Sequence, residues 1–420
     1  MSVMEETVFL TSHIKDLDLT GERILLRLDL NVPVVGNKII NDHKIKQALP
    51  TIDMLQKKGA KVIIMTHIGR PKEYPPGFST KHLIPWFKQN GYVAQFEPNF
   101  DKAKMESYKN PNDILLLENL RFFDGEQNEG HFTIFAQDIA IIGDKQDVKA
   151  HLFAKNLADI GDYYVNDAFG AMHRHDTSIT LVPQLFDPKK RFLGPLVERE
   201  SLMLSKLVKN PEQPFTLIMG GGKIKDKLPL LAKLVDKVDT ILLCPAIVFT
   251  FSKFLGKKIG KSLVDDSVIS IVPDILKKAQ EKGVNILFPL DYQAATDNFN
   301  GPLSYTESEA IEHNHVGVSI GPKTEGYFKD EILKSKTIFF NGAFGNMNKN
   351  KTLEGMKHIL EAMGEINGFS VVGGGDSVAV ANMFGIANKI DYLSTGGGAT
   401  LTYVSGLELP GLKAFEKEST

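Results

Sequence analysis

The sequence predicts an α/β fold built from parallel sheets with helices on both sides. Short, mostly apolar runs, such as residues 62–65 and 215–219, recur along the chain, and stretches with helical spacing of apolar residues separate them. Such runs are typical of strands buried on both faces, and their alternation with helices is typical of parallel sheets. The length of 420 residues is sufficient for two or three domains.

The composition excludes several classes of protein. A net charge of −2 and an isoelectric point near 6.6 give no strong attraction to nucleic acid or to an anionic membrane. The single cysteine, Cys244, excludes an intramolecular disulfide and a structural zinc site of its own, which fits a reducing cytoplasm. No run approaches the roughly 18 apolar residues of a membrane span, and the acidic N-terminus is unlike a signal peptide. We therefore expect a cytoplasmic protein without nucleic-acid or membrane partners.

The first strand is expected over residues 24–30, where positions 24, 26, 28 and 30 are isoleucine or leucine. Alternation places these apolar residues on one face of the strand and Arg27, Asp29 and Asn31 on the other. Pro33 ends the strand, because proline has no N–H to donate. The polar face of this strand therefore ends in two side chains that can bind a ligand.

A helix and three further strands are expected in the rest of the first half. The helix runs from about Ala48 to a stop at Gly59. The strands, each with the loop that follows it, occupy residues 62–65 and 66–71, 114–117 and 118–121, and 163–165 and 166–174. Each of these loops begins where an apolar strand ends, as expected for a sheet whose loops carry the functional side chains.

Cationic side chains lie just beyond these strand ends. They are His67, Arg70, Arg121, His173 and Arg174. Each one alone is more typical of a surface cation than of a binding residue. Because parallel strands end at a common edge of the sheet, we expect the five to surround a small, multiply anionic ligand.

The connection between two domains is expected over residues 190–214. Leucines at helical spacing predict a helix there, and Pro211 and Pro214 end it. The alternation of strand and loop then restarts. The expected strands of the second half are residues 215–219, 241–243, 285–288, 337–340, 369–372 and 392–393.

Loops of the second half are rich in glycine instead of arginine. Glycine triplets occupy residues 220–222, 373–375 and 396–398, and Lys223 and Lys227 follow the first of them at the start of a helix. Glycine lets the backbone approach a ligand closely, and the N-terminus of a helix attracts anions. These loops, with Asp376 as the one carboxylate, suit a nucleotide polyphosphate and its magnesium ion. A tight turn with solvated lysines is the alternative interpretation.

Together these stretches resemble the phosphoglycerate kinase family from about Leu19 to Leu412. The resemblance includes RLDLNVP at 27–33, THIGRP at 66–71 and MGGGKIKDK at 219–227. Further matching motifs are residues 115–122, 166–174, 321–324, 341–342, 372–377, 394–399 and 407–412. The resemblance implies a phosphotransferase of glycolysis that moves a phosphoryl group reversibly between 1,3-bisphosphoglycerate with ADP and 3-phosphoglycerate with ATP, as Mg²⁺ complexes of the nucleotides.

The resemblance also implies two Rossmann-like lobes, each a parallel sheet flanked by helices, with a hinged cleft between them. Residues 1–192 would bind phosphoglycerate, residues 406–420 would pack back on that lobe, residues 193–405 would bind the nucleotide, and the protein would be monomeric. The residues implied for phosphoglycerate binding are Asp29, Asn31, Lys44, His67, Arg70, Arg121 and Arg174. Those implied for catalysis are Lys44, Lys223, Gly375 and Gly398. Those implied for the nucleotide are Lys227, Gly317, Asn348, Gly374, Gly375, Asp376 and Ser377, with Asp376 also as the metal ligand.

Several positions depart from the pattern of the family. Lys44 stands where the family has an arginine that stabilises the transferring group, and lysine lacks the planar fork of arginine. Residues 244–246, Cys-Pro-Ala, replace three glycines beside the adenine. Asn348 replaces a glutamate that meets the ribose, and Ser319 replaces an aspartate. About 20 additional residues lie between Gln127 and Lys149, and no role is assigned to them.

These departures leave an alternative open. The chain is either an active phosphoglycerate kinase, or a similar protein with reduced activity or altered nucleotide preference that acts as a binding or regulatory module. The substitution at Lys44 favours low activity, and residues 244–246 favour a different base preference. The complete set of expected phosphate ligands favours the active kinase.

Overall fold

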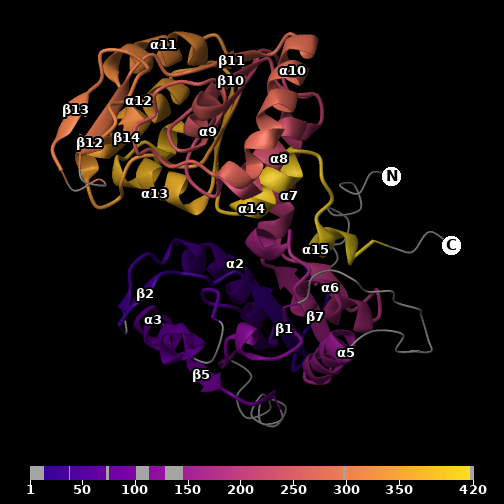
Figure 1. The fold of residues 1–420 in the computed structure, drawn as a ribbon. Helices are drawn as coiled ribbons and strands as arrows, with labels where there is room; N and C mark the ends of the chain where they lie inside the picture. Colours follow the sequence, from indigo (N-terminus) through magenta and orange to yellow (C-terminus); the bar gives the residue numbers. More distant parts are fainter. Residues whose placement is uncertain are drawn as a thin grey trace. The chain divides into compact units, whose positions relative to one another are not determined.

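The computed structural model describes residues 14–36, 38–71, 75–100, 113–127, 145–296, 299 and 301–416. Contacts divide the chain into two compact units, one of residues Met1–Leu202 with Glu408–Thr420 and one of residues Met203–Leu407 (Figure 1). We call them unit 1 and unit 2. Within the described ranges, no helix has both the length and the apolar character needed to cross a membrane. The additional residues expected before Lys149 fall mostly at 128–144, outside the described residues.

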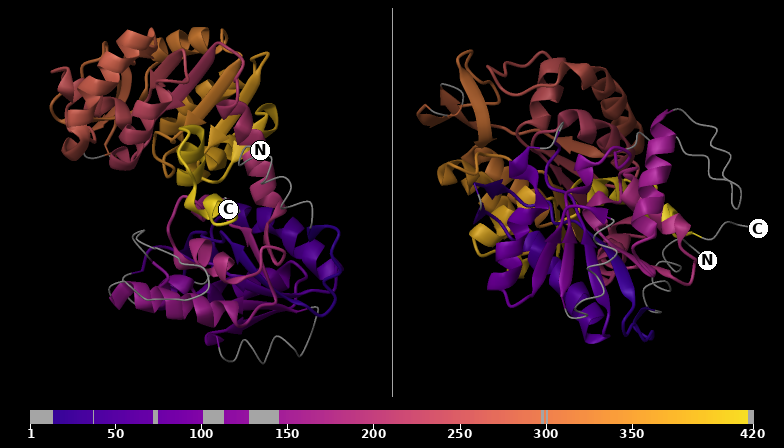
Figure 2. Two further views of the ribbon diagram at one scale, coloured as in Figure 1. Left: turned by 90° about the vertical axis from the view of Figure 1, so that its right-hand side faces the viewer. Right: turned by 90° about the horizontal axis from the view of Figure 1, so that it is seen from below.

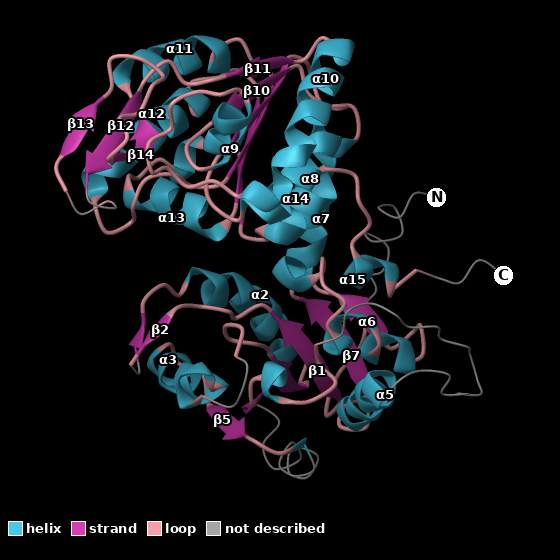
Figure 3. Ribbon diagram, in the orientation of Figure 1, coloured by secondary structure: helices cyan, strands magenta, loops and turns pink. Residues whose placement is uncertain are grey.

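Unit 1 is built on a sheet of six parallel strands. In spatial order they are β5 (Ala94–Glu97), β6 (Ile114–Leu117), β4 (Lys61–Met65), β1 (Arg23–Leu28), β7 (Tyr163–Asp167) and β8 (Arg191–Leu193). The helices of this unit are α2 (His43–Lys57), α3 (Ile84–Gln89), α5 (Lys145–Ala158) and α6 (Thr177–Thr180), with short 3₁₀ turns η1 (Pro76–Phe78), η2 (Thr80–Leu83), η3 (Leu120–Phe122), η4 (Phe169–Ala171) and η5 (Val182–Leu185). A two-stranded hairpin, β2 (Val34–Val35) and β3 (Lys38–Ile39), follows β1. The parallel sheet flanked by helices confirms the predicted fold class (Figure 3).

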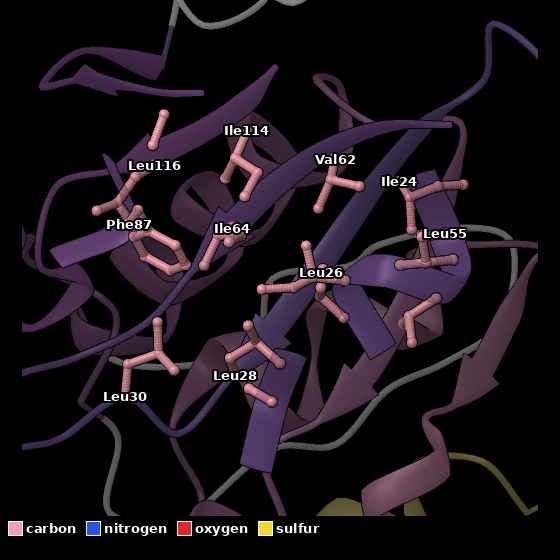
Figure 4. Close-up of a cluster of buried hydrophobic side chains, with 14 of the residues drawn as sticks. Ile24, Leu26, Leu28, Leu30, Leu55, Val62, Ile64, Phe87, Ile114 and Leu116 are labelled. Carbon is pink, nitrogen blue, oxygen red and sulfur yellow. The ribbon is translucent and has the colours of Figure 1, made fainter. Parts of the chain in front are cut away.

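The core of unit 1 confirms the alternation predicted for β1. Ile24, Leu26 and Leu28 are fully buried and belong to one cluster with Leu55 of α2 and Val62 of β4 (Figure 4). The other face of β1 turns Arg27 away from this cluster, and its side chain is also fully buried. One strand therefore supplies the apolar core on one side and a buried cation on the other.

Helix α2 begins at His43, five residues before the expected start at Ala48. The expectation was wrong because it began the helical spacing at Ala48, whereas Ile45 in the first turn, three positions earlier, is also fully buried in the core. The side chain of Asn41 accepts a hydrogen bond from the N–H of His43 at 2.9 Å and fixes the entry into the helix. The expected stop is confirmed, because Gly59 has φ of +74° and its N–H bonds back to the carbonyl of Gln56.

Unit 2 is built on a second sheet of six parallel strands. In spatial order they are β11 (Asn285–Leu287), β10 (Thr240–Leu243), β9 (Phe215–Met219), β15 (Thr337–Asn341), β16 (Phe369–Gly373) and β17 (Tyr392–Ser394). The helices are α8 (Ile224–Leu234), α9 (Ile247–Phe254), α10 (Val272–Lys282), α11 (Pro322–Ile332), α12 (Glu354–Met363), α13 (Gly375–Met383) and α14 (Gly398–Val404), with 3₁₀ turns η6 (Asp266–Ile271), η7 (Asn350–Leu353) and η8 (Ala387–Lys389). Helices lie on both faces of this sheet (Figures 2 and 3). All six predicted strands are present, with ends that differ by at most one residue.

A third sheet in unit 2 was not predicted. It is antiparallel and consists of β13 (Leu303–Tyr305), β12 (Tyr292–Thr296) and β14 (His315–Ile320). Its strands contain many small and polar residues, and a bulge between Gln293 and Ala294 interrupts the register. The apolar runs that mark the parallel strands are therefore missing from it.

Helix α7 (Pro195–Val208) connects the two units, and the division between them falls after its eighth residue, Leu202. Its first turn is held by Asp167, at the end of β7. One carboxylate oxygen of Asp167 accepts the N–H groups of Leu196 and Val197 at 2.8 and 3.1 Å. The other oxygen accepts the hydroxyl of Thr51 on α2. Asp167 therefore caps α7 and ties it to α2.

The C-terminal segment of the chain packs on unit 1. Helix α15 (Pro410–Lys413) lies against α6, and the N–H of Gly411 donates to the carbonyl of Met172 at 2.9 Å. A side chain added at Gly411 would collide with Met172 and Ile179. The ring of Phe415 lies 6.1 Å from that of Tyr164, between ring centres. Residues from both ends of the chain thus form one unit.

The cap of α7 gives a first prediction. Asp167→Ala is expected to lower the free energy of unfolding of unit 1 by about 2–4 kcal/mol, because it leaves two buried N–H groups of α7 without acceptors. Trp86 is the only tryptophan and lies in unit 1, so its fluorescence during urea denaturation reports on this unit. Asp159→Ala, which removes an exposed carboxylate after α5, is the control and should change stability by no more than about 0.5 kcal/mol. Equal midpoints for the two variants would contradict the role of Asp167.

Candidate functional site

The expected anion site of unit 1 lies where β1 meets its two neighbours. β1 is paired with β4 on one side and β7 on the other, so the chain changes direction across the sheet at this strand. The loops after these strands begin at the carboxyl ends of the strands. In parallel sheets, ligands bind at this end. Most of the side chains that the sequence predicts to bind the anionic ligand follow β1, β4, β6 and β7.

Lys44 and Asp29 form an ion pair at this edge. The ammonium group of Lys44 lies 2.6 Å from a carboxylate oxygen of Asp29, and both side chains are largely shielded from solvent. Burial acts to raise the pKa of Asp29, but Lys44 and Arg27 outweigh it and hold that pKa below its usual range. Asn31 accepts the N–H of Gly69 at 2.9 Å, so the loops after β1 and β4 are joined.

His67 is the centre of a group of cations. It is 4% exposed, and burial holds its pKa well below the usual range. Four cationic side chains lie close enough to lower that pKa further: Arg27, Arg121, Lys44 and Arg174. The imidazole is therefore neutral at physiological pH, and the positive charge of the site comes from lysine and arginine.

Within the part of the chain that the structure describes, buried polar atoms of Arg121 and His173 have no hydrogen-bond partner. Arg121 donates to the carbonyl of Gly69 at 2.5 Å and to Asp176 at 3.3 Å, while its buried Nε has no acceptor. The buried Nδ1 of His173 and Nδ2 of Asn166 also lack partners. Burial and Arg174 lower the pKa of His173 to about 4. Burying a polar group without a partner costs free energy, so these atoms indicate a binding site for a polar ligand or water.

Arg70 is the predicted residue that the structure does not bring into this group. Its side chain is exposed, and within the described residues it makes no hydrogen bond or ion pair. Phe78 packs against Gly69, and that glycine has φ of +64°, which fixes the loop just before Arg70. The backbone at Arg70 is thus held in place while its guanidinium group remains in solvent.

The glycine loop after β9 forms the start of the candidate nucleotide site in unit 2. Lys223 caps helix α8 in the left-handed conformation, with φ of 57° and ψ of 44°. The N–H groups of Gly220 and Gly221 donate to the carbonyls of Asn341 and Pro245, at 3.1 and 2.9 Å. Side chains at Gly220 or Gly221 would collide with neighbouring backbone. The loop is therefore locked against the ends of β15 and β10.

Lys227 lies one turn into α8 and bonds to the same loop. Its ammonium group donates to the carbonyl of Gly220 at 2.6 Å. Burial and the nearby Lys223 lower the pKa of Lys227 to about 8, while Asp376 acts in the opposite direction. The two lysines and Asp376 therefore lie near one another, as the sequence predicts for a phosphate site.

The second and third glycine loops provide backbone N–H groups at the starts of helices. Gly374, with φ of 104°, precedes α13, and Gly397, with φ of 57°, precedes α14. The N–H of Gly374 donates to the carbonyl of Ser394 at 3.0 Å, which joins the two loops. The hydroxyl of Ser377 is buried and has no hydrogen-bond partner among the described residues, whereas Asp376 beside it is exposed. The first turn of α13 thus presents a free hydroxyl and one carboxylate.

These residues fit a magnesium ion that arrives with its nucleotide. Within the described residues there is no group of three or more histidine, cysteine or acidic side chains that could hold a metal ion alone. Magnesium is commonly held by one or two carboxylates together with the phosphates of a substrate. The exposed Asp376, close to Lys227, matches that pattern.

The residues expected beside the nucleoside are arranged differently from the phosphate loops. Gly317 is buried in β14, its N–H donates to the hydroxyl of Ser262 at 2.9 Å, and Phe249 fills the space beside its Cα. Asn348 is exposed, and its N–H donates to the side chain of Asn346. Ala246 has φ of 75° and ψ of −67°, a strained conformation for a residue with a Cβ. Residue 246 therefore departs from the family pattern in sequence and also has a backbone conformation that is unusual for alanine.

Sequence reasoning missed three residues that build the site of unit 1. Arg27 was placed on the polar face of β1 but given no role, and Glu126 and Ser178 were not singled out. These three form a buried cluster beneath His67. No sequence signal joins them, because Arg27 and Ser178 are 151 positions apart.

Comparisons with known proteins agree with this arrangement. The family model for phosphoglycerate kinase matches residues 14–407. The chain is 38% identical to the phosphoglycerate kinase of Porphyromonas gingivalis, over 96% of this chain and 99% of that protein. It is 37% identical to that of Dictyoglomus turgidum, over 96% and 98% of the two chains.

Solved structures of the same kind are also similar. Phosphoglycerate kinase from Coxiella burnetii has a TM-score of 0.74 at 30% identity, and that from Pyrococcus horikoshii has a TM-score of 0.80 at 25% identity. Both comparisons cover 96% of this chain and 98% of the other. With the sheets, the cationic edge and the glycine loops described above, these matches show that the chain belongs to the phosphoglycerate kinase family of enzymes.

Proposed function

We propose that this chain carries out the reaction of its family, the reversible phosphoryl transfer between 1,3-bisphosphoglycerate with ADP and 3-phosphoglycerate with ATP, in glycolysis. The observation that carries the proposal is the gathering of Lys44, Arg121 and Arg174 around the buried His67. Several cations around one neutral donor suit a small molecule with several negative charges, and phosphoglycerate is such a molecule.

Unit 1 is the proposed site of the phosphoglycerate. Arg121 and Arg174 bind its charged groups, Asp29 and Asn31 accept its hydroxyl, and His67 donates to it. We propose that Arg70, which is exposed in the structure, also binds the phosphoglycerate. The free Nε of Arg121 supports this proposal, because the desolvated donor is left for the ligand to satisfy.

Unit 2 is the proposed site of the nucleotide. Lys227, Ser377 and the N–H groups after Gly374 take its phosphates, Asp376 takes the magnesium ion, and Gly317 and Asn348 lie on the side of the nucleoside. The unpaired hydroxyl of Ser377 and the conformation of Gly374 support the phosphate assignment. Magnesium bound to the nucleotide neutralises negative charge that develops on the phosphates.

The transfer itself needs alignment and charge neutralisation from the protein. We propose that Lys44 and Lys223 contact the moving phosphoryl group, and that the N–H groups of Gly375 and Gly398 stabilise its oxygens. No general base is required, because the accepting oxygen is already ionised at neutral pH. His67 is therefore not needed as a base, and we propose that the neutral imidazole binds the substrate.

The proposal extends to location and assembly. We infer that the protein acts as a monomer in the cytoplasm. The single cysteine, Cys244, is buried and free, which supports a reducing compartment. The sequence has no heptad repeat that would favour a coiled-coil dimer.

A second candidate is a kinase of this family with altered nucleotide preference. The strained conformation of Ala246 and the replacement of glycines at 244 and 245 favour it. Turnover with GTP equal to or above that with ATP would support this second candidate. A preference for ATP of more than about tenfold in kcat/KM would exclude it.

The transfer chemistry is tested by removing Lys223. In a coupled assay with 3-phosphoglycerate and saturating MgATP, we expect the unchanged protein to turn over at more than about one per second. Lys223→Met should lower kcat roughly 100- to 1,000-fold, because it removes a cation from the transferring group. Lys225→Met, an exposed lysine of the same helix, should leave kcat within about twofold. Equal effects of the two substitutions would refute the assignment, and turnover near zero in the unchanged protein would favour a binding module.

Lys44 is tested by restoring the arginine of the family. Lys44→Arg is expected to raise kcat roughly tenfold or more, because the guanidinium fork holds the transferring group with two hydrogen bonds. Lys46→Arg is the control, since Lys46 lies on the same helix, is mostly exposed and pairs with Asp42. A kcat unaffected by Lys44→Arg would mean that another cation already has this role.

The pKa of Lys227 predicts how nucleotide binding depends on pH. Because the pKa is lowered to about 8, the lysine loses its charge as the pH rises through that value, and the anionic nucleotide then binds less tightly. The Kd for MgADP, measured by calorimetry, should rise roughly tenfold between about pH 7 and pH 9. Lys227→Met should bind weakly at both pH values and show no such change. A Kd that stays constant over this range in the unchanged protein would contradict the assignment of Lys227.

A further inference from the structure

The side chain of Arg27 is fully buried beneath the anion site of unit 1. Its Nε donates to the hydroxyl of Ser178 at 2.8 Å, and one terminal nitrogen donates to the carbonyl of Leu28 at 2.6 Å. The other terminal nitrogen lies 3.1 Å from Nδ1 of His67. The guanidinium group is thus held on three sides, and the third contact is with the histidine at the centre of the cation group.

This last contact determines which nitrogen of His67 carries the proton. A guanidinium group can only donate hydrogen bonds, so Nδ1 of His67 must be the acceptor. The imidazole is neutral, because burial and four neighbouring cations hold its pKa well below the usual range. A neutral imidazole has one N–H, which must therefore be on Nε2. Within the described residues, the hydrogen bond of Nδ1 to Arg27 is the only one that the ring of His67 makes.

Glu126 and Ser178 hold Arg27 in this position. The hydroxyl of Ser178 accepts from Arg27 and donates to a carboxylate oxygen of Glu126 at 2.6 Å. The other oxygen of Glu126 accepts the N–H of Ser178 at 2.8 Å. Glu126 is fully buried, and its nearer oxygen lies 3.9 Å from Arg27. Glu126 therefore orients the serine, and its carboxyl group lies near the guanidinium group of Arg27.

The surroundings of Glu126 confirm that the cluster is closed to solvent. Burial and the nearby Asp176 raise the pKa of Glu126 to about 7, and Arg27 acts in the opposite direction. The hydroxyl of Tyr164, on β7, donates to the carbonyl of Ser178. The segment around Glu126 is also bound through its backbone, since its carbonyl accepts the N–H of Thr177 at 2.7 Å. Elements β1, β7, α6 and the turn after η3 all contribute to this cluster.

We propose that Arg27, held by Ser178 and Glu126, is a positioning residue that fixes the tautomer of His67, so that His67 meets the anionic substrate as a neutral donor through Nε2–H. The proposal rests on the proposed function in one respect, that His67 contacts the phosphoglycerate. A neutral donor binds an anion by hydrogen bonding without adding a further charge to a site that already holds several cations. Arg27 thereby acts on the substrate through His67.

The free protein, labelled with ¹⁵N-histidine, gives the first test. His67 is one of 11 histidines, and its signal is identified by its absence in His67→Gln. Two-bond ¹H–¹⁵N correlation spectra should show the proton on Nε2, and the signal should not titrate between about pH 5.5 and 8. A proton on Nδ1, or titration near the ordinary pKa of about 6.5, would overturn the proposal. This measurement needs no substrate, so it is independent of the proposed function.

Substitution of Arg27 gives the second test. Arg27→Lys keeps a charge but loses the fork, so His67 should populate both tautomers and KM for 3-phosphoglycerate should rise roughly five- to tenfold with little change in kcat. Arg23→Lys is the matched control, because Arg23 lies at the opposite end of β1 and pairs with Asp162. Ser178→Ala, a milder change, should produce a smaller shift in the same direction and serves if Arg27→Lys does not fold.

A double-mutant cycle separates action through His67 from other effects. In the His67→Gln background, Arg27→Lys should no longer change KM, because the residue through which it acts is gone. An undiminished effect there would overturn the proposal. If His67→Gln does not change KM, His67 does not bind the substrate, and that part of the proposed function is refuted. The NMR measurement on the free protein would still show which nitrogen of His67 carries the proton.

Discussion

The parallel sheet is the constraint on which both candidate sites depend. All strands of each sheet end at one edge, so side chains from distant segments gather there whether or not their charges attract. In unit 1 this gathers Lys44, Arg121 and Arg174, whose mutual repulsion must be offset. Asp29 pairs with the lysine and Asp176 with Arg121, while His67 stays neutral. The site is therefore a balanced group, with hydrogen-bond donors left over for the ligand.

In unit 2, the loops at the ends of the parallel strands carry mainly backbone N–H groups instead of arginine side chains. Its loops present backbone dipoles, which cannot be titrated and do not repel one another as full charges do. Close packing requires glycine at position 342, since a side chain at Gly342 would collide with Lys227 and with the carbonyl of Gly220. Fixed dipoles suit the constant part of a nucleotide, its phosphates, whereas arginine forks suit the several charged groups of a small acid.

The sequence predicted the parts of the fold that depend on local pattern. Most strands of the two parallel sheets were found because most of their residues are buried, and the glycine loops because few other residues adopt their conformations. The sheet of β12, β13 and β14 was not found, since its residues are small or polar and its strands pair across a bulge. The cluster of Arg27, Ser178 and Glu126 was not found either, because only the folded chain brings β1 to α6. The predicted ligand residues remain predictions, and the structure adds that Arg70 is exposed while Arg121 is buried.

In the segment 244–246, residues with side chains replace the glycines expected from the family, and the backbone conformation at position 246 is one that favours glycine. Pro245 has no N–H, but the contact it makes with the phosphate loop uses its carbonyl, which accepts the N–H of Gly221 at 2.9 Å. Ala246 keeps a positive φ of 75°, as a glycine would adopt, at a cost of roughly 1–3 kcal/mol. Such strain persists only where surrounding contacts fix the backbone, here the helix α9 that begins at the next residue and the glycine loop beside it. The contact of this segment with the phosphate loop therefore does not depend on the backbone N–H that proline lacks.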